Sequence, residues 1–216
     1  TNGLQNRHIA LWQSHGFYYE PKLNRWEWQR ARCLQTVEDL YTQSFVLPYL
    51  VPMLENAGAN VLLPRERDCQ TAEIIIDNDG CLNTGSTYAE HTADKVWLQG
   101  TGKGFAHLRP QYIDFENPFK EGTFRIAETV KKGKESTAEW IPEIPQNGQY
   151  AVYVSYQTVP NSSDDALYTV YHKGGVSQFK VNQKMGGGTW VYLGTFGFDA
   201  GKSNACKVTL SNRSAK

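Results

Sequence analysis

The spacing of hydrophobic and polar residues changes along the chain and predicts two kinds of structure. The first part, residues 1–79, contains a short apolar run at 8–12 that suits a buried strand. Aromatic clusters at 17–19 and 26–28 lie on either side of a proline and predict a hairpin or an ordered aromatic loop. Two further apolar runs, at 60–63 and 73–77, read as strands.

The clearest predicted helix begins at Thr36. Thr36 can cap the helix, and Asp39 can reach back to it. Apolar residues then recur at helical spacing as far as residue 54 and predict one buried face. Pro48 and Pro52 remove amide donors inside this pattern, so the helix should kink or split just before them, and Gly58 is a plausible end. A helix between short apolar strands is typical of a parallel α/β sheet.

The rest of the chain favours β structure. Residues 80–114 show a weak pattern with many glycines and predict a linker with short strands. Residues 115–216 predict an all-β antiparallel sandwich of about seven strands. In this part, residues 149–156 alternate with a period of two, and residues 173–176 give a strong hairpin signal.

Charge narrows the range of partners. The 216 residues contain 22 Lys and Arg against 22 Asp and Glu, a balance that argues against nucleic acid or anionic lipid as the main partner. Residues 1–79 hold 7 of these basic residues and 10 of the acidic ones, so the two parts of the chain differ in sign. No apolar run approaches the ~18 residues of a membrane span.

The four cysteines form no CxxC pair, which argues against a thiolate zinc site. Cys69 and Cys81 could form a disulfide across a short loop, or remain buried as free thiols. The sequence leaves both alternatives open.

The C-terminal part resembles a known family. Its segments Gly148–Tyr156, Asp165–Gly175 and Gly186–Phe196 are similar in order and spacing to the golvesin/xanthan-lyase carbohydrate-binding-like domain of bacterial secreted proteins. The resemblance covers roughly residues 115–216 and implies a polysaccharide or cell-wall partner and a periplasmic or extracellular location. The family pattern continues past residues 208–212 into one more strand, so the resemblance implies a sandwich truncated at its C-terminal strand, or one whose last strand comes from elsewhere.

The N-terminal part is similar to the companion region of Bacteroides proteins labelled as xanthan lyases and, more distantly, to zinc-dependent N-acetylmuramoyl-L-alanine amidases. His15-Gly16 and the segment Leu54–Val61 carry this resemblance. It implies a zinc ion held by His15 and by Glu38 or Asp39, and peptidoglycan as the substrate. The family's later Ser-x-His motif and its C-terminal catalytic Glu have no counterpart here, so whether the chain is an enzyme stays open.

The metal prediction has a structural alternative. His15 can be a hydrogen-bonded loop histidine, and Glu38 a helix-terminus charge favoured by the helix dipole. Three other histidines are candidate third ligands, although no spacing selects one: His91, His107 and His172. With two named ligands at most, we predict no tightly held zinc in this chain.

Aromatic residues are the candidate sugar contacts. An aromatic ring can stack on the apolar face of a pyranose while polar neighbours bind its hydroxyl groups. Trp190, Tyr192 and Tyr171 are the main candidates, with Tyr153 and Tyr156 beside them. The alternative is that most of these rings fill the sandwich core. The sequence therefore favours a secreted glycan- or cell-wall-directed binding module, with a fragment of a zinc amidase-like hydrolase as the alternative and a purely structural surface protein as a third.

Overall fold

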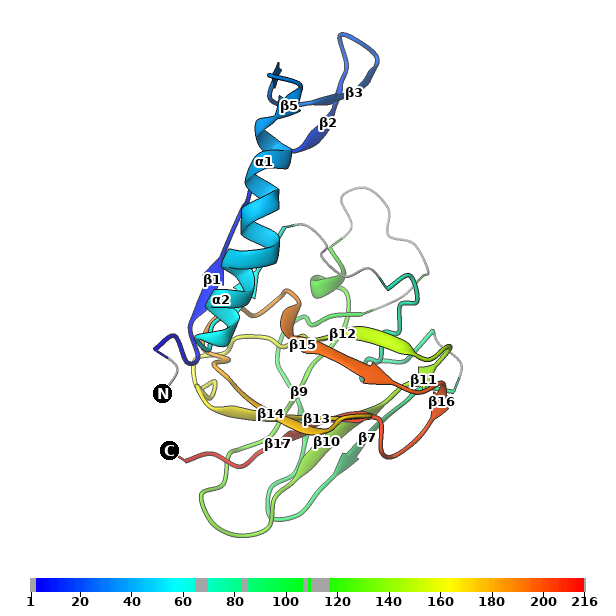
Figure 1. Ribbon diagram of the computed structural model, residues 1–216. Helices are drawn as coiled ribbons and strands as arrows, with labels where there is room; N and C mark the ends of the chain where they lie inside the picture. The colour runs from blue at the N-terminus through cyan, green and yellow to red at the C-terminus, as the bar shows by residue number, and fades with distance from the viewer. Residues whose placement is uncertain (1–2, 65–69, 83–84, 107–108, 110–116, 216) are drawn as a thin grey trace. The chain divides into compact units, whose positions relative to one another are not determined.

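The computed structural model describes residues 3–64, 70–82, 85–106, 109 and 117–215 (Figure 1). The chain divides into two compact units, Thr1–Arg67 and Asp68–Lys216. The division falls before residue 79, because residues 70–79 contact the second unit, for example through hydrogen bonds from Gln70 to the Gln149 carbonyl and from Asn78 to Thr123. The expected linker, residues 80–114, contributes strands to the same unit. None of the described helices is long and apolar enough to cross a membrane.

The first unit is built around one parallel strand pair. Strand β1 (His8–Ala10) pairs with β6 (Asn60–Leu62), with Ile9 opposite Val61. A helical segment connects the two strands and is made of α1 (Glu38–Phe45), the π-helix η1 (Val46–Leu50) and α2 (Val51–Asn56). Val51, Ala59 and Val61 form the buried centre of this unit. One strand–helix–strand crossover of the predicted α/β sheet is therefore present, whereas the amidase likeness stays a prediction.

Several local predictions for this unit are confirmed. Strands β2 (Phe17–Glu20) and β3 (Arg25–Trp28) form the expected hairpin. The α-helix is interrupted from Val46 by the π-helix that contains Pro48, close to the kink or split expected near residues 45–47, and Pro52 lies in the first turn of α2. The segment ends before Gly58, whose φ of 97° is a left-handed conformation that favours glycine.

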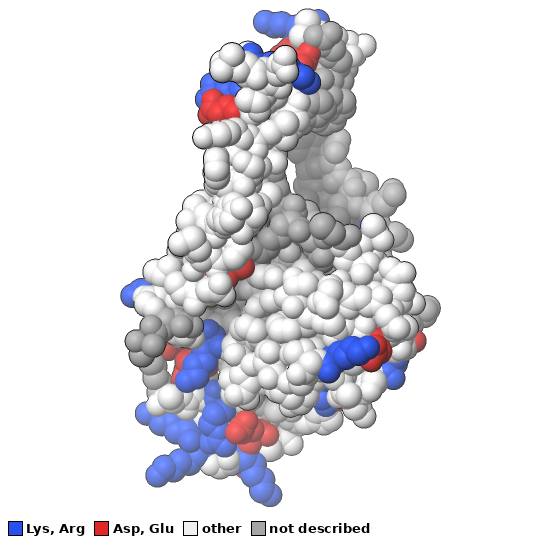
Figure 2. Space-filling model, in the orientation of Figure 1, with Lys and Arg blue, Asp and Glu red and all other residues white. Residues whose placement is uncertain are grey.

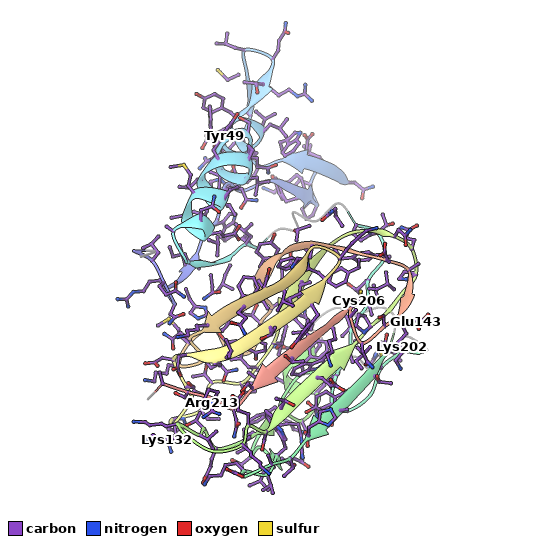
Figure 3. The ribbon with its side chains drawn as sticks, turned by 60° about the horizontal axis from the view of Figure 1, so that its bottom comes forward. Tyr49, Lys132, Glu143, Lys202, Cys206 and Arg213 are labelled. Carbon is purple, nitrogen blue, oxygen red and sulfur yellow. The ribbon has the colours of Figure 1, made fainter. Side chains whose placement is uncertain are left out.

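Two helix predictions are wrong. Thr36 does not cap the helix; it belongs to the short strand β5 (Thr36–Val37), which pairs with β4 (Arg32–Cys33), and α1 begins at Glu38 without a side-chain cap. The predicted buried face is also incomplete, because Tyr41 is 62% exposed while Val51 is buried. Tyr49, labelled in Figure 3, is 65% exposed on the same segment.

The second unit contains a five-stranded antiparallel sheet with the order β14-β13-β17-β10-β7 (Figure 1). Its strands are β7 (Thr87–His91), β10 (Thr137–Ile141), β13 (Ala166–His172), β14 (Gly175–Val181) and β17 (Lys207–Ser211). The predicted hairpin at 173–176 joins β13 and β14. Strand β17 lies between β13 and β10, in the middle of the sheet. A further strand after β17 stays a prediction.

A second antiparallel pair, β12 (Gly148–Val154) with β15 (Val191–Phe198), lies over this sheet in Figure 1. The space between the two layers is filled by side chains from both. Val170 and Val191 are fully buried there, and burying such a side chain stabilises the fold by ~1.5–3 kcal/mol. Tyr168 is 2% exposed, and its hydroxyl accepts a hydrogen bond from Gln183 Nε2 at 3.0 Å. The second unit is thus a two-layered antiparallel β structure.

Short elements complete this unit. They are β8 (Leu98–Gln99) paired with β9 (Arg125–Ile126), β11 (Glu143–Ile144) paired with β16 (Gly201–Lys202), and the 3-10 helix η2 (Pro118–Lys120). The strand predicted at 73–77 is wrong. Only Asp77 bridges, to Gly80 across a tight turn, because the polar sequence Asp77-Asn78-Asp79-Gly80 bends the chain. Strand β7, from the predicted linker, pairs along its whole length with β10.

Candidate functional site

A polar cavity of about 340 Å³ lies at the β7 edge of the five-stranded sheet, and we call it the edge pocket. It is bounded by β7, by the β8–β9 pair and by the turn at residues 77–80. Its lining is almost entirely polar: Asn78, Asp79, Tyr88, Ala89, Glu90, Gln99, Thr123 and Arg125.

The alternation of strand β7 directs two of these side chains. Tyr88 and Glu90 lie on the same face of the strand, opposite Trp140 and Ala138 of β10. The ring of Tyr88 packs on the Trp140 ring, with centroids 5.4 Å apart, which fixes the direction of its hydroxyl. Because β7 is an edge strand, this face is only partly covered, and the polar ends of both side chains reach the edge pocket.

A bidentate ion pair forms one wall. Arg125 Nε and one terminal nitrogen donate to the two oxygens of Glu90 at 2.6 and 2.9 Å, and that same terminal nitrogen also donates to the Trp97 carbonyl at 3.1 Å. The Tyr88 hydroxyl donates to Glu90 at 2.6 Å. This fork geometry is the strong form of carboxylate recognition by arginine.

The protonation states follow from these contacts. The hydrogen bond from Arg125, assisted by the one from Tyr88 and by the guanidinium charge, holds the pKa of Glu90 below its ordinary value despite its burial. The hydrogen bond to Glu90 raises the pKa of Arg125. Burial, together with the hydrogen bond to Glu90 and its charge, raises the pKa of the Tyr88 hydroxyl. At neutral pH the wall therefore carries a carboxylate, a guanidinium and a protonated phenol.

The opposite wall is the turn that carries Asp79. Its carboxylate accepts hydrogen bonds from the backbone amide and the hydroxyl of Thr123, and from Asn78 Nδ2 at 3.1 Å. Gly122 allows this approach, since a Cβ there would lie 1.9 Å from the Phe105 carbonyl oxygen and 2.7 Å from Asp79 Oδ2. Any other residue at position 122 would collide with the Phe105 carbonyl and with the Asp79 carboxylate.

Asp77 begins the same turn. Burial raises its pKa to about 6, and the charge of Asp79 adds to this shift against the opposing backbone hydrogen bonds. Asp77 Oδ1 accepts the backbone amide of Asp79 at 3.0 Å. The turn therefore depends on a carboxyl group that loses its proton close to neutral pH.

The edge pocket presents hydrogen-bonding groups of both kinds. The amide side chains of Asn78 and Gln99 can donate and accept, the carboxylates accept, and the guanidinium donates. Such a set suits a ligand that carries several hydroxyl groups.

Sequence reasoning did not single out the edge-pocket residues. Glu90 and Arg125 are 35 positions apart and lie in a region whose pattern is weak. The one available signal was the Asp77-Asn78-Asp79-Gly80 turn sequence, which was read as the end of a strand.

The aromatic candidates do not come together in one place. Trp190 packs edge-to-face against Phe105 and Phe119, with ring centroids 4.9 and 5.8 Å away. The indole is half-buried and belongs to this small aromatic cluster, in line with the alternative that it fills the core.

The two tyrosine candidates lie on different layers. Tyr192 stands opposite Tyr153 on the β12–β15 pair, with ring centroids 5.3 Å apart, and its hydroxyl is 2.8 Å from Thr195 Oγ1. Tyr171 belongs to β13, and Lys207 Nζ lies 5.6 Å from its ring centroid. Both rings are half-buried. A sugar contact at Trp190, Tyr192 or Tyr171 stays a prediction.

The metal candidates lie in the first unit and point to different partners. Asp39 is fully buried and accepts hydrogen bonds from the Ser14 hydroxyl and, at 2.6 Å, from the Gly16 backbone amide. Glu38 has a 62% exposed side chain, and its Oε2 is 3.8 Å from Arg30 Nε. His15 is exposed in the loop after β1.

The pKa of Asp39 reflects its role in this loop. Burial alone would raise it, but the hydrogen bonds from Ser14, Gly16 and the Arg30 backbone, and the charge of His15, hold the pKa below its ordinary value. Asp39 therefore ties the loop after β1 to the start of α1, which is a structural use of the carboxylate.

The candidate third ligands have other contacts. His91 Nε2 is 3.0 Å from Glu139 Oε1, and His172 Nε2 is 3.0 Å from Ser177 Oγ. His107 lies outside the described residues, as does Cys69, so the two alternatives of a Cys69–Cys81 disulfide and of free thiols stay open. Within residues 3–64, 70–82, 85–106, 109 and 117–215, no three His, Cys, Asp or Glu side chains form a group that could hold a metal. The described residues thus do not form a three-ligand zinc site, and the weaker zinc site that the amidase resemblance implies at His15 and Glu38 or Asp39 stays a prediction.

Comparison with known proteins shows what the second unit is similar to. Residues 119–216 match the family model of the Golvesin C-terminal domain. Over 81 residues the chain is 35% identical to a xanthan lyase of Bacillus sp. (strain GL1), a match that covers 38% of this chain and 8% of that protein. A solved structure, that of Paenibacillus xanthan lyase, is similar over 58% of this chain and 13% of its own length, with 21% identity and a TM-score of 0.37. The chain thus spans less than a tenth of its curated relative.

Proposed function

Since residues 119–216 form a golvesin/xanthan-lyase-like domain, we propose that this chain binds polysaccharide and that the edge pocket makes the contact. The carrying observation is the pocket lining itself, in which a bidentate Glu90–Arg125 pair faces the amides of Asn78 and Gln99 across about 340 Å³. The pocket combines residues that precede the matched segment with Thr123 and Arg125 inside it.

Preorganisation supports this proposal. Arg125 and Glu90 hold each other, and their side chains are only 28% and 19% exposed, so a ligand would order few additional groups. Binding to groups that are already fixed loses less conformational entropy than binding to mobile ones. The cavity volume lies at the lower end of the ~300–1,000 Å³ typical of ligand pockets, which suits a short stretch of a sugar chain.

Separate aromatic rings elsewhere on the second unit would complement the edge pocket. Tyr192 and Tyr153 are paired across the β12–β15 layer, and Tyr171 lies on β13. We propose these rings as secondary stacking contacts for a longer glycan, with Trp190 as a half-buried member of its aromatic cluster.

The proposal concerns binding and not cleavage. Xanthan lyase is the name of the similar protein, of which this chain covers 8%, and an activity of the whole protein would need more than the described site. No contact among the described residues favours the amidase-like alternative. A location outside the cytoplasm and a peptidoglycan substrate stay predictions.

Gln99 offers the sharpest test. Its side chain is exposed in the edge pocket, so replacing it with Ala should not affect folding. Isothermal titration calorimetry against a panel of neutral and acidic oligosaccharides should show binding by the wild-type protein and a loss of about 2- to 10-fold for Gln99→Ala, the effect of one hydrogen bond.

Gln178 supplies the matched control. It is also exposed but lies on β14, at the other edge of the sheet. Gln178→Ala should bind as the wild type does. Equal affinities for all three proteins would exclude the edge pocket as the contact, and the absence of any glycan binding by the wild type would refute the proposed function.

A further inference from the structure

Three exposed lysines gather in the loop between β9 and β10. They are Lys131, Lys132 and Lys134, with Gly133 between them. Most other lysines with a described contact face a carboxylate: Lys95, Lys173, Lys184 and Lys207 each pair with Asp or Glu. The part of the chain that the structure describes offers no such partner to the three loop lysines. Figure 2 shows Lys and Arg side chains gathered at one end of this unit.

Arg213 braces the loop from its backbone side. The terminal nitrogens of its guanidinium donate to the carbonyl oxygens of Lys131 and Gly133, both at 2.9 Å, and its Nε donates to Glu135 at 2.8 Å. Figure 3 places Arg213 and Lys132 close together at one end of the five-stranded sheet. The arginine therefore uses its donors to shape the loop and leaves the ammonium groups of the lysines available.

The acidic side chains near the loop also bind its backbone or Arg213 and not the lysine ammonium groups. Asp94 Oδ2 accepts the backbone amide of Lys134 at 2.9 Å, and Glu135 binds Arg213 and the hydroxyl of Ser211. Gly133 has a φ of 105°, and a Cβ there would lie 2.3 Å from Asp94 Oδ2, so only glycine allows this turn. The loop conformation is thus fixed by contacts that do not involve the lysine side chains.

We infer that this loop binds the carboxylate groups of an acidic polysaccharide. The inference rests on the proposed function and names the class of glycan. Lysine suits this task, because its ammonium group is a point charge on a flexible stem and can follow carboxylates along a chain, whereas a guanidinium imposes one fork geometry. The bracing by Arg213 and Asp94 keeps the three charges together before the ligand arrives.

The charge balance of the chain also argues against nucleic acid or an anionic membrane as the ligand. The chain as a whole is balanced, with 22 basic and 22 acidic residues, whereas nucleic-acid and anionic-membrane surfaces recruit proteins through broad basic faces. Three lysines in one short loop match a locally charged sugar chain better than a densely charged duplex or bilayer.

The test compares polygalacturonate with its methyl ester, which has the same backbone without the free carboxylates. The variant Lys131→Gln/Lys132→Gln/Lys134→Gln in the full chain should bind polygalacturonate about tenfold more weakly than the wild type, the combined effect of three exposed ion pairs. It should bind the ester as the wild type does. Wild-type affinity for polygalacturonate should also fall with added salt.

A control variant removes the same charge elsewhere. Lys103→Gln/Lys180→Gln/Lys202→Gln changes three exposed lysines of the second unit and should keep wild-type affinity. An equal loss in both triple variants would overturn the inference, because it would show an effect of net charge alone. Unchanged affinity in the loop variant, or wild-type binding that does not distinguish acid from ester, would overturn it as well.

Two further probes test the ligand class. Vesicles of phosphatidylcholine and phosphatidylserine, and a DNA duplex, should bind more weakly than polygalacturonate at the same ionic strength. Lysine-dependent binding of either at equal strength would overturn the assignment to polysaccharide. The proposed function fails separately, if the wild type binds neither polygalacturonate, its ester nor any neutral glycan.

Discussion

Replacing Asp77 with Asn should stabilise the protein in a way that depends on pH. The carboxyl group has a folded-state pKa of about 6 against an ordinary value of 3.8, because burial disfavours its ionised form. Between these two values the folded protein binds more protons than the unfolded chain. The free energy of unfolding of the wild type therefore falls as pH rises from about 4 to about 6, and this contribution stays constant above that range.

The magnitude follows from the size of the shift. A difference of about two pKa units corresponds to about 3 kcal/mol at 1.36 kcal/mol per unit. Asp77 is only partly buried, so screening by water lowers the expected penalty to about 1–2 kcal/mol. Asparagine has nearly the same shape and keeps an oxygen that can accept the Asp79 amide, now 3.0 Å from Asp77 Oδ1.

Urea unfolding at pH 4 and pH 7.5 measures the effect. Asp77→Asn should gain about 1–2 kcal/mol at pH 7.5 and at most a few tenths at pH 4. Asp199→Asn is the control, since Asp199 is exposed and pairs with Lys173 on the surface; it should change stability by less than about 1 kcal/mol. A gain of the same size at both pH values, or a loss at pH 7.5, would refute the explanation by burial of the charge.

Two other predictions concern the edge pocket and the metal. Arg125→Ala should lower the free energy of unfolding by about 2–4 kcal/mol, because it leaves the half-buried Glu90 carboxylate and the Trp97 carbonyl without the guanidinium. Urea unfolding measures this change. A loss below about 1 kcal/mol would show that the ion pair does not stabilise the fold. Elemental analysis of the purified protein should find no stoichiometric zinc; zinc that is lost in His15→Ala would instead reveal a metal site at the loop after β1.

Features that depend on neighbouring residues could be predicted from the sequence. The hairpin between β13 and β14 follows from alternation around two glycines, and the irregular helix follows from prolines that lack an amide donor. The likeness to the golvesin domain was also recognised from the order of its strand motifs, and it is confirmed by the match over residues 119–216.

Features that depend on pairing between residues far apart in the sequence could not be predicted in this way. Strand β7 is a short, mostly polar segment, and only its pairing with β10 makes it part of the sheet. Thr36 is a local exception: threonine often caps helices, but a tight turn pairs Thr36 with Cys33 and places it in a strand. Glu90 and Arg125 come into contact only when β7 and β9 lie close together, so no local sequence pattern predicts the edge pocket.

The central position of β17 affects how the second unit can form during synthesis. Strands β10 and β13 are each made well before β17, yet both pair with it and not with one another. Until residue 211 has left the ribosome, each keeps an unpaired edge that could join another chain. Arg213, which shapes the lysine loop 80 residues upstream, emerges later still. Assembly of the sheet and of the loop therefore waits until residues 207–213 have been made, and until then the nascent chain must keep the edges of β10 and β13 from joining another chain.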